Sequence, residues 1–184
     1  MPAVGLTDHG SMAGAIELYR STQKQGVKPL LGCEVYVADN RRAQTKGNAH
    51  LTLLAADNTG YSNLIKLTST AYLEGYYYKP RVDWELLERH SEGLVALSGC
   101  LSGRVAKAME ENRPTDAAAD LDRLAQIFGR DSTYVEIQNA GLDIQQRINP
   151  MLAELAGTAG LPLVATGDVH YLICLLYTSD AADE

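Results

Sequence analysis

Short apolar segments alternate with helix-forming segments along most of the chain, and this alternation constrains the fold more than any other feature. The apolar segments are rich in Val, Leu, Ile, Tyr and Thr and are bounded by Gly, Asn and Asp, as strands are. The predicted strands span residues 3–7, 31–38, 51–56, 94–98, 133–138 and 163–166. The predicted helices span residues 12–25, 61–73, 84–89, 102–111, 117–128 and 142–159. Such alternation predicts an α/β fold with a mostly parallel sheet or barrel.

Two segments depart from strict alternation. Between residues 31 and 56 two predicted strands follow each other without a helix, so we expect a hairpin there. Residues 76–81 read Tyr-Tyr-Tyr-Lys-Pro-Arg, which indicates an aromatic and basic loop. This loop is consistent with a packed surface loop, and also with a nucleic-acid contact in which tyrosines stack on bases and Arg81 meets a phosphate.

The composition excludes several classes of protein. The chain has 184 residues, of which 46% are apolar and 21% charged, and this suits one globular domain. No apolar run approaches the ~20 residues of a membrane-spanning helix, and the N-terminus lacks the features of a secretory signal. The net charge of −7 argues against a free-standing nonspecific DNA-binding protein. We therefore expect a cytoplasmic protein without membrane association.

The three cysteines, Cys33, Cys100 and Cys174, are too few and too unevenly spaced to indicate a disulfide framework. A chain without an export signal is expected to stay in the reducing cytoplasm, where disulfides are rare. A functional cysteine in this chain is therefore expected to be a thiolate ligand or a nucleophile.

Both ends of the chain differ from the rest. Residues 174–184 can be encoded by a nucleotide string that resembles the transposase adapter used in sequencing libraries, so we interpret residues 173–184 as a non-native tail. The other end begins directly in a predicted strand, and we interpret Met1 as an internal methionine. The predicted domain spans residues 1–172 and is incomplete at its N-terminus.

Residues with metal-binding side chains lie at the edges of predicted strands, except Glu34, which lies inside one. The set contains three histidines, two acids and one cysteine, which are His9, Glu34, His50, Cys100, Asp168 and His170. In α/β barrels the carboxyl ends of the strands form one rim, so residues far apart in sequence converge there. Imidazole, carboxylate and thiolate groups together bind divalent transition metals such as zinc, manganese or iron. The pattern therefore indicates a candidate metal site.

Position alone leaves a second interpretation open, because a histidine that follows a strand is usually just a polar loop residue. Glu34 strengthens the metal interpretation, since it lies between apolar residues, where an unpartnered acid would be costly. Asp8 is a candidate outer partner for His9 or a neighbouring ligand. His50 lies at the start of its strand, so it reaches the common rim only if that strand runs antiparallel or the rim loop folds back.

Six stretches, taken together and in order, resemble one family: the polymerase-and-histidinol-phosphatase (PHP) domain of the bacterial DNA polymerase III alpha subunit. They include Leu-Thr-Asp-His-Gly, Leu-Gly-Cys-Glu-Val-Tyr, Leu-Ser-Gly-Cys-Leu and Thr-Gly-Asp-Val-His-Tyr. The stretches span residues 1–10, 28–36, 50–55, 72–81, 97–101 and 162–171. The resemblance covers essentially residues 1–172.

The resemblance implies a distorted, TIM-like, seven-stranded β/α barrel with up to three divalent metal ions (zinc, manganese or iron) at one rim. Nine protein ligands build the full cluster in this family, and six of them match the candidate metal-site residues of this chain. The other three, a His-x-His pair and an Asp, would precede Met1, as would the first strand and helix. The resemblance thus assigns the six residues to the metal site.

The resemblance also implies metal-dependent phosphoester hydrolysis, and we favour a 3′–5′ exonuclease that removes misincorporated nucleotides. Lys79 or Arg81 is expected to contact the DNA backbone. One alternative is a non-catalytic scaffold that stabilises the polymerase and docks a separate exonuclease. Another is a small-molecule phosphatase, against which the polymerase-type residues 72–81 argue. The parent protein is expected to be a DNA-directed DNA polymerase, with DNA and other replicase subunits as partners.

Overall fold

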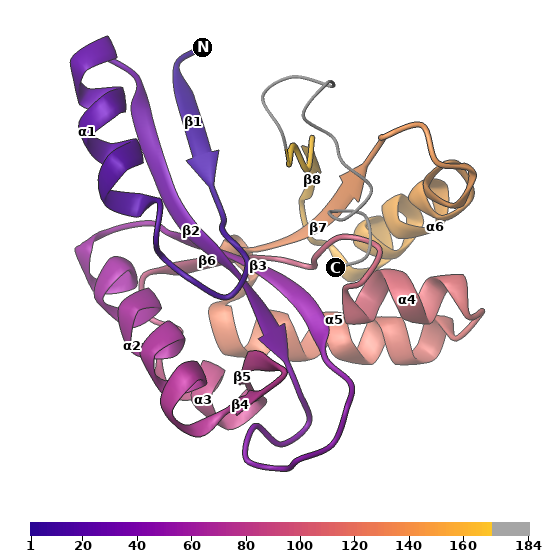
Figure 1. Cartoon of the computed structure of the whole chain (residues 1–184). Helices are drawn as coiled ribbons and strands as arrows, with labels where there is room; N and C mark the ends of the chain where they lie inside the picture. Colours follow the sequence, from indigo (N-terminus) through magenta and orange to yellow (C-terminus); the bar gives the residue numbers. More distant parts are fainter. Residues whose placement is uncertain (171–184) are drawn as a thin grey trace.

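The computed structural model describes residues 1–170, which form one curled sheet with helices packed against it (Figure 1). The strands are β1 (Ala3–Leu6), β2 (Lys28–Val37), β3 (Ala49–Ala55), β4 (Tyr76–Tyr77), β5 (Lys79–Val82), β6 (Leu94–Leu97), β7 (Thr133–Gln138) and β8 (Leu163–Thr166). The helices are α1 (Ala15–Gln25), α2 (Asn58–Glu74), α3 (Trp84–Arg89), α4 (Arg104–Glu110), α5 (Pro114–Phe128) and α6 (Asp143–Ala159). The predicted strand–helix alternation is confirmed.

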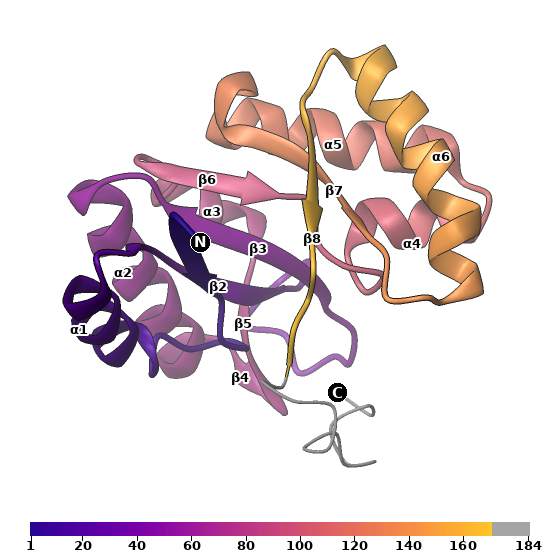
Figure 2. The same ribbon diagram turned by 90° about the horizontal axis from the view of Figure 1, so that it is seen from above.

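The sheet has the strand order β4-β5-β2-β3-β6-β7-β8, and β1 pairs with the first half of β2. Viewed from above, β8 runs steeply across the direction of β2 and β3, because the sheet curls strongly from one end to the other (Figure 2). The result is a half-barrel in a mixed α/β fold. The expected barrel-like α/β class is therefore confirmed, in an open form for the part of the chain that the structure describes.

The expected hairpin between residues 31 and 56 is also confirmed. β2 and β3 run antiparallel, with Glu34 opposite Thr52 and Tyr36 opposite His50. This antiparallel pairing brings the start of β3 beside the second half of β2. His50 is therefore a diagonal neighbour of Glu34, although it lies near the start of its strand.

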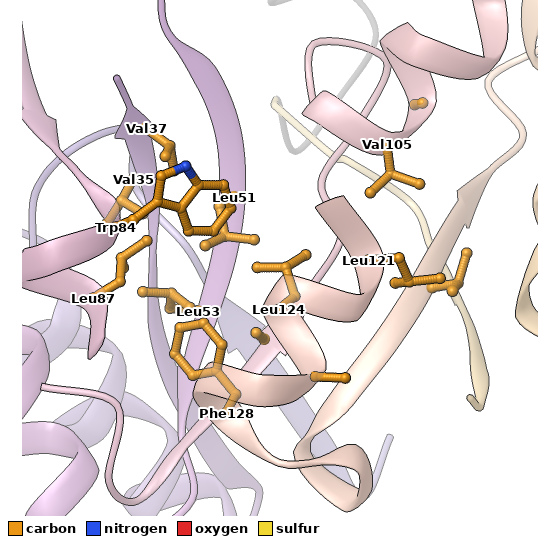
Figure 3. Close-up of a cluster of buried hydrophobic side chains, with 14 of the residues drawn as sticks. Val35, Val37, Leu51, Leu53, Trp84, Leu87, Val105, Leu121, Leu124 and Phe128 are labelled. Carbon is orange, nitrogen blue, oxygen red and sulfur yellow. The ribbon is translucent and has the colours of Figure 1, made fainter. Parts of the chain in front are cut away.

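Strand alternation separates an apolar face from a polar face. Val35, Val37, Leu51 and Leu53 point toward the helices and pack with Trp84, Leu124 and Phe128, among others (Figure 3). Because successive side chains on a strand point to opposite faces, Glu34, His50 and Thr52 lie on the other face. Cys33 is fully buried in the apolar core, where burial raises the pKa of its thiol to about 12. The functional side chains therefore face the inside of the half-barrel.

The prediction of a loop over residues 76–81 is wrong. These residues form the tight hairpin of β4 and β5, in which Tyr77 pairs with Lys79 and Tyr78 makes the turn with a φ of 61°. β5 then extends the sheet by pairing parallel to the end of β2. The two-residue length of β4 explains why periodicity did not reveal it.

Arg81 lies in this hairpin and is only 2% exposed. Its guanidinium group donates hydrogen bonds of 2.7–3.0 Å to the backbone carbonyls of Gly75, Thr45, Arg41 and Ala43. These bonds tie the 38–48 loop to the end of α2. The structure therefore gives Arg81 a structural role in place of the expected DNA contact.

Two sequence predictions concern the ends of the chain. The interpretation of residues 173–184 as a non-native tail concerns residues outside the described part of the chain. Tyr171 and Leu172, at the predicted domain boundary, also lie outside it.

Within residues 1–170, none of the helices is both long and apolar enough to cross a membrane.

Candidate metal centre

Glu34 is the centre of the polar cluster inside the half-barrel. Its backbone is fixed by the loop after β1, since its N–H donates to the carbonyl of Asp8 at 3.1 Å and its carbonyl accepts from the N–H of Gly10 at 2.8 Å. Its carboxylate oxygen Oε1 lies 2.8 Å from Nδ1 of His9 and 2.8 Å from Nδ1 of His50. Glu34 is only 6% exposed, so these two imidazoles satisfy a carboxylate that would otherwise be costly to bury.

Cys100 joins the cluster through the loop that follows β6. Its Sγ atom lies 3.5 Å from Nδ1 of His50, and the His50 backbone N–H donates to the carbonyl of Ser102 at 3.1 Å. Gly99 allows this close approach: its φ is +92°, and a Cβ atom there would lie 2.4 Å from the His50 carbonyl oxygen. One loop thus places both the thiol and the imidazole.

The charges within this cluster stabilise one another. Burial alone would raise the pKa of Glu34, but hydrogen bonding and charge attraction from His50 and His9 outweigh it and hold that pKa below its usual range. Burial alone would lower the pKa of His50, but its contacts with Cys100 and Glu34 outweigh burial and raise the pKa to about 10. Without a metal, these contacts favour a protonated His50 beside an ionised Glu34.

The donor atoms fit a transition metal ion. One ligand atom each from Glu34, His50 and Cys100 lies within 4.8 Å of the other two. Tetrahedral zinc with bonds of about 2.0–2.3 Å requires ligand atoms roughly 3.3–3.8 Å apart. The 3.5 Å between Sγ and Nδ1 matches that spacing, and the 2.8 Å hydrogen bond between Glu34 and His50 would open by about half an ångström. A carboxylate, imidazole and thiolate set suits zinc or a similar borderline metal.

The segment after β8 supplies the remaining predicted residues. Asp168 has a φ of 45°, a left-handed conformation that turns the chain sharply. Nδ1 of His170 lies 2.9 Å from the Asp168 carbonyl oxygen and 3.8 Å from its carboxylate oxygen Oδ1. The His170 ring centroid is 5.4 Å from that of His9, which is 6.1 Å from that of His50. His9 therefore stands between the Asp168–His170 pair and the Glu34–His50–Cys100 group.

Asp8 and Lys79 lie near the cluster in different ways. The Asp8 carboxylate accepts a hydrogen bond from the N–H of Gly14 at 2.8 Å, just before α1, while its backbone carbonyl accepts from Glu34. Asp8 thus supports Glu34 through the backbone.

Lys79 Nζ lies 5.3 Å from the centroid of the Tyr36 ring. The Tyr36 and His50 rings form an edge contact with their centroids 5.2 Å apart. One residue, Tyr36, therefore lies between the Lys79 ammonium group and the candidate ligand His50.

Sequence reasoning missed one buried acid of this face, Glu136 on β7. It is 4% exposed, and burial raises its pKa, with repulsion from Asp168 and Glu34 adding to the effect. The signal that singled out Glu34, an acid between apolar residues in a predicted strand, was also present at Val135-Glu136-Ile137.

A mixed nitrogen, oxygen and sulfur donor cluster inside a curled α/β half-barrel defines a class of candidate metalloproteins. Comparisons with known proteins identify the family to which the chain belongs. Residues 1–140 match the model of the PHP domain, and the chain belongs to this family. The predicted resemblance is confirmed. The matched range includes four of the six predicted ligands and ends before Asp168 and His170.

Several relatives of this chain are DNA polymerase III alpha subunits. The subunit of Thermus aquaticus is 47% identical over 178 residues, which cover 93% of this chain and 14% of that protein. The subunit of Treponema pallidum is 45% identical over 175 residues, covering 92% and 15%. The subunit of Deinococcus radiodurans is 46% identical over 180 residues, covering 93% and 13%. The chain therefore spans only a small part of the length of these relatives.

One solved structure supports the fold. A Bifidobacterium adolescentis protein, proposed to be a metal-dependent phosphoesterase, superimposes with a TM-score of 0.51 at 16% sequence identity. The superposition covers 93% of this chain and 78% of that protein. At this identity the match establishes a shared architecture.

Proposed function

We propose that the chain is part of a DNA polymerase III alpha subunit and that its PHP domain is a metal-dependent phosphoesterase acting as a 3′–5′ exonuclease on DNA. The observation that carries the proposal is the convergence of Glu34, His50 and Cys100 within 4.8 Å, with His9 on the same carboxylate. The relatedness to alpha subunits supports DNA as substrate and other replicase subunits as partners in the cytoplasm.

Six residues are proposed to hold up to three zinc, manganese or iron ions: His9, Glu34, His50, Cys100, Asp168 and His170. Divalent metals in such clusters lower the pKa of a water molecule and neutralise phosphate charge, which is the chemistry of phosphoester hydrolysis. The chain's own residues prepare the site. Glu34 holds two imidazoles with one oxygen, and the loop at Gly99 sets the thiol against His50.

Lys79 is proposed to contact the DNA backbone. It is partly buried beside Tyr36, which itself packs on His50, so a phosphate near the metal cluster would lie close to its ammonium group. Asp8 is proposed to act as an outer partner through its backbone bond to Glu34. The domain is proposed to span residues 1–172.

The test is a nuclease assay on purified protein with a primer that carries a mismatched 3′ end, after metal analysis. We expect release of 3′ nucleotides that is lost in His50→Ala and kept in the matched control His90→Ala, since His90 lies at the end of α3, outside the cluster. Metal binding without hydrolysis would replace the exonuclease with the scaffold function. Hydrolysis of small phosphate monoesters alone would favour a small-molecule phosphatase.

A further inference from the structure

The buried Glu136 side chain connects three strands of the half-barrel. It lies on β7, and its carboxylate accepts a hydrogen bond from the Thr166 hydroxyl on β8 and another, at 3.4 Å, from the Thr52 hydroxyl on β3. The Gln138 side-chain amide, on the same face of β7, donates to both Glu136 and Thr166 at 3.2 and 3.3 Å. One carboxylate therefore bridges β3 and β8, which are not neighbours in the sheet.

The two threonines lie next to candidate ligands on their strands. Thr52 is two residues after His50 and is paired directly opposite Glu34, so it shares their face of the sheet. Thr166 is the last residue of β8, two residues before Asp168. The Glu136 carboxylate thus links the strand that carries His50 to the strand that leads into Asp168 and His170.

β8 depends on this link more than the other strands do. Its only backbone pairing among the described residues is with β7, and the burial of its four residues is at most intermediate. Leu163, at its start, is 43% exposed. A strand with so little apolar burial is weakly held by packing, so specific hydrogen bonds decide how precisely its end is placed.

Stability alone does not explain why position 136 carries a buried acid. The hydrogen bonds that its carboxylate accepts within residues 1–170 come from neutral groups, two hydroxyls and one amide. A buried acid with two more acids nearby, Asp168 and Glu34, is costly to keep. Polar groups of this kind that support metal ligands are typical of metal sites.

We propose that Glu136 is a positioning residue that holds the Asp168–His170 segment against the Glu34–His50–Cys100 group, through hydrogen bonds to Thr166 and Thr52. The inference rests on the proposed metal centre. It assigns to one buried carboxylate the task of joining two sets of ligands that lie far apart in the sequence.

The test uses four variants of the full chain. Thr166→Val removes the β8 hydroxyl without changing the size of the side chain, and Glu136→Ala removes the whole link. Glu136→Gln keeps an acceptor oxygen and should retain part of the native zinc affinity and of the protection from hydrogen exchange. The matched control is Thr133→Val. Thr133 is fully buried on β7, the strand of Glu136, and its hydroxyl donates to the carbonyls of Gly129 and Leu124, away from the cluster.

Two readouts separate this inference from the proposed function. Hydrogen exchange of the metal-free chain should show faster exchange in residues 163–170 for Thr166→Val and Glu136→Ala, but not for Thr133→Val. Zinc affinity, measured by chelator competition, should fall about 10- to 100-fold in the same two variants, with Glu136→Gln between them and the native chain.

The outcomes are distinct. If the native chain binds zinc and both Thr166→Val and Glu136→Ala keep its affinity and its exchange pattern, the positioning role is wrong. If Glu136→Ala does not fold, Thr166→Val alone decides. If the exchange result holds and the native chain binds no zinc, the link between strands stands and the proposed metal function is wrong.

Discussion

Nδ1 of His50 and Oε1 of Glu34 lie 2.8 Å apart as diagonal neighbours on β3 and β2. This contact exists because the two strands form an antiparallel hairpin, which brings the beginning of one beside the end of the other. Cys100 then reaches the same imidazole from a loop fifty residues away. The candidate metal centre therefore depends on one hairpin and one glycine-containing loop.

The metal-free chain is expected to lose stability as the pH rises above neutral. The pKa of His50 is about 10 in the folded chain, against about 6.5 in an unfolded one. The stabilisation from its bound proton is complete below about pH 6.5 and disappears as the pH rises through about 10. Thermal melts between pH 6.5 and 8.5 should show a falling Tm for the native chain and a flatter profile for His50→Gln. Equal slopes for both would show that His50 is not held as an imidazolium.

Gly99→Ala is expected to disturb the site through the backbone. The φ of +92° costs an alanine about 1–3 kcal/mol, and its Cβ would also press on the His50 carbonyl oxygen. Zinc affinity should fall together with the free energy of unfolding. Gly141→Ala is the control, because Gly141 has a φ of +83° but a Cβ atom there would meet no atom within 4 Å, so only stability should change. If both variants keep native zinc affinity, the loop does not set the thiol.

Arg81→Ala is expected to destabilise the fold by about 2 kcal/mol or more, because four backbone carbonyl groups lose the guanidinium donor and two of these hydrogen bonds are buried. Arg42→Ala is the comparison, since Arg42 has a side chain that is 56% exposed, and it should change stability by about 0.5 kcal/mol or less. Urea titrations measure both. A small effect for Arg81→Ala would argue against its role in tying the loop to α2.

Lys79→Ala is expected to weaken DNA binding in every sequence context and to reduce the salt dependence of binding by roughly one phosphate contact. Lys28→Ala, at the exposed start of β2, should leave both unchanged. Fluorescence anisotropy with single-stranded DNA at several salt concentrations measures the slope. An unchanged slope in Lys79→Ala would remove this residue from the proposed DNA contact.

Sequence patterns were sufficient for much of the fold because most strands and helices here are long enough to show their periodicity. β2 and β3 were predicted as consecutive strands, but only their observed register explains how His50 reaches Glu34. The β4–β5 hairpin was missed, since β4 has two residues and β5 contains Pro80, which sits badly in a strand pattern.

The candidate site shows the same limit. Glu34 and Glu136 carry the same sequence signal, an acid between apolar residues in a strand, yet their partners differ completely. The partners of Glu34 are imidazoles and those of Glu136 are hydroxyl and amide groups, and all of them except Gln138 lie far from these acids in the sequence. Arg81 was expected at a phosphate because its basic character is visible in sequence, whereas its burial depends on the fold of the 38–48 loop.

The most direct test of the central claim is a titration of the metal-free chain with Co²⁺, followed by absorption spectroscopy. A thiolate ligand gives an intense charge-transfer band, and the account predicts this band in the native chain. It should be lost in Cys100→Ala and kept in Cys33→Ala, because Cys33 is fully buried in the apolar core. No band in the native chain, or a band that survives in Cys100→Ala, would contradict a metal centre built on Glu34, His50 and Cys100.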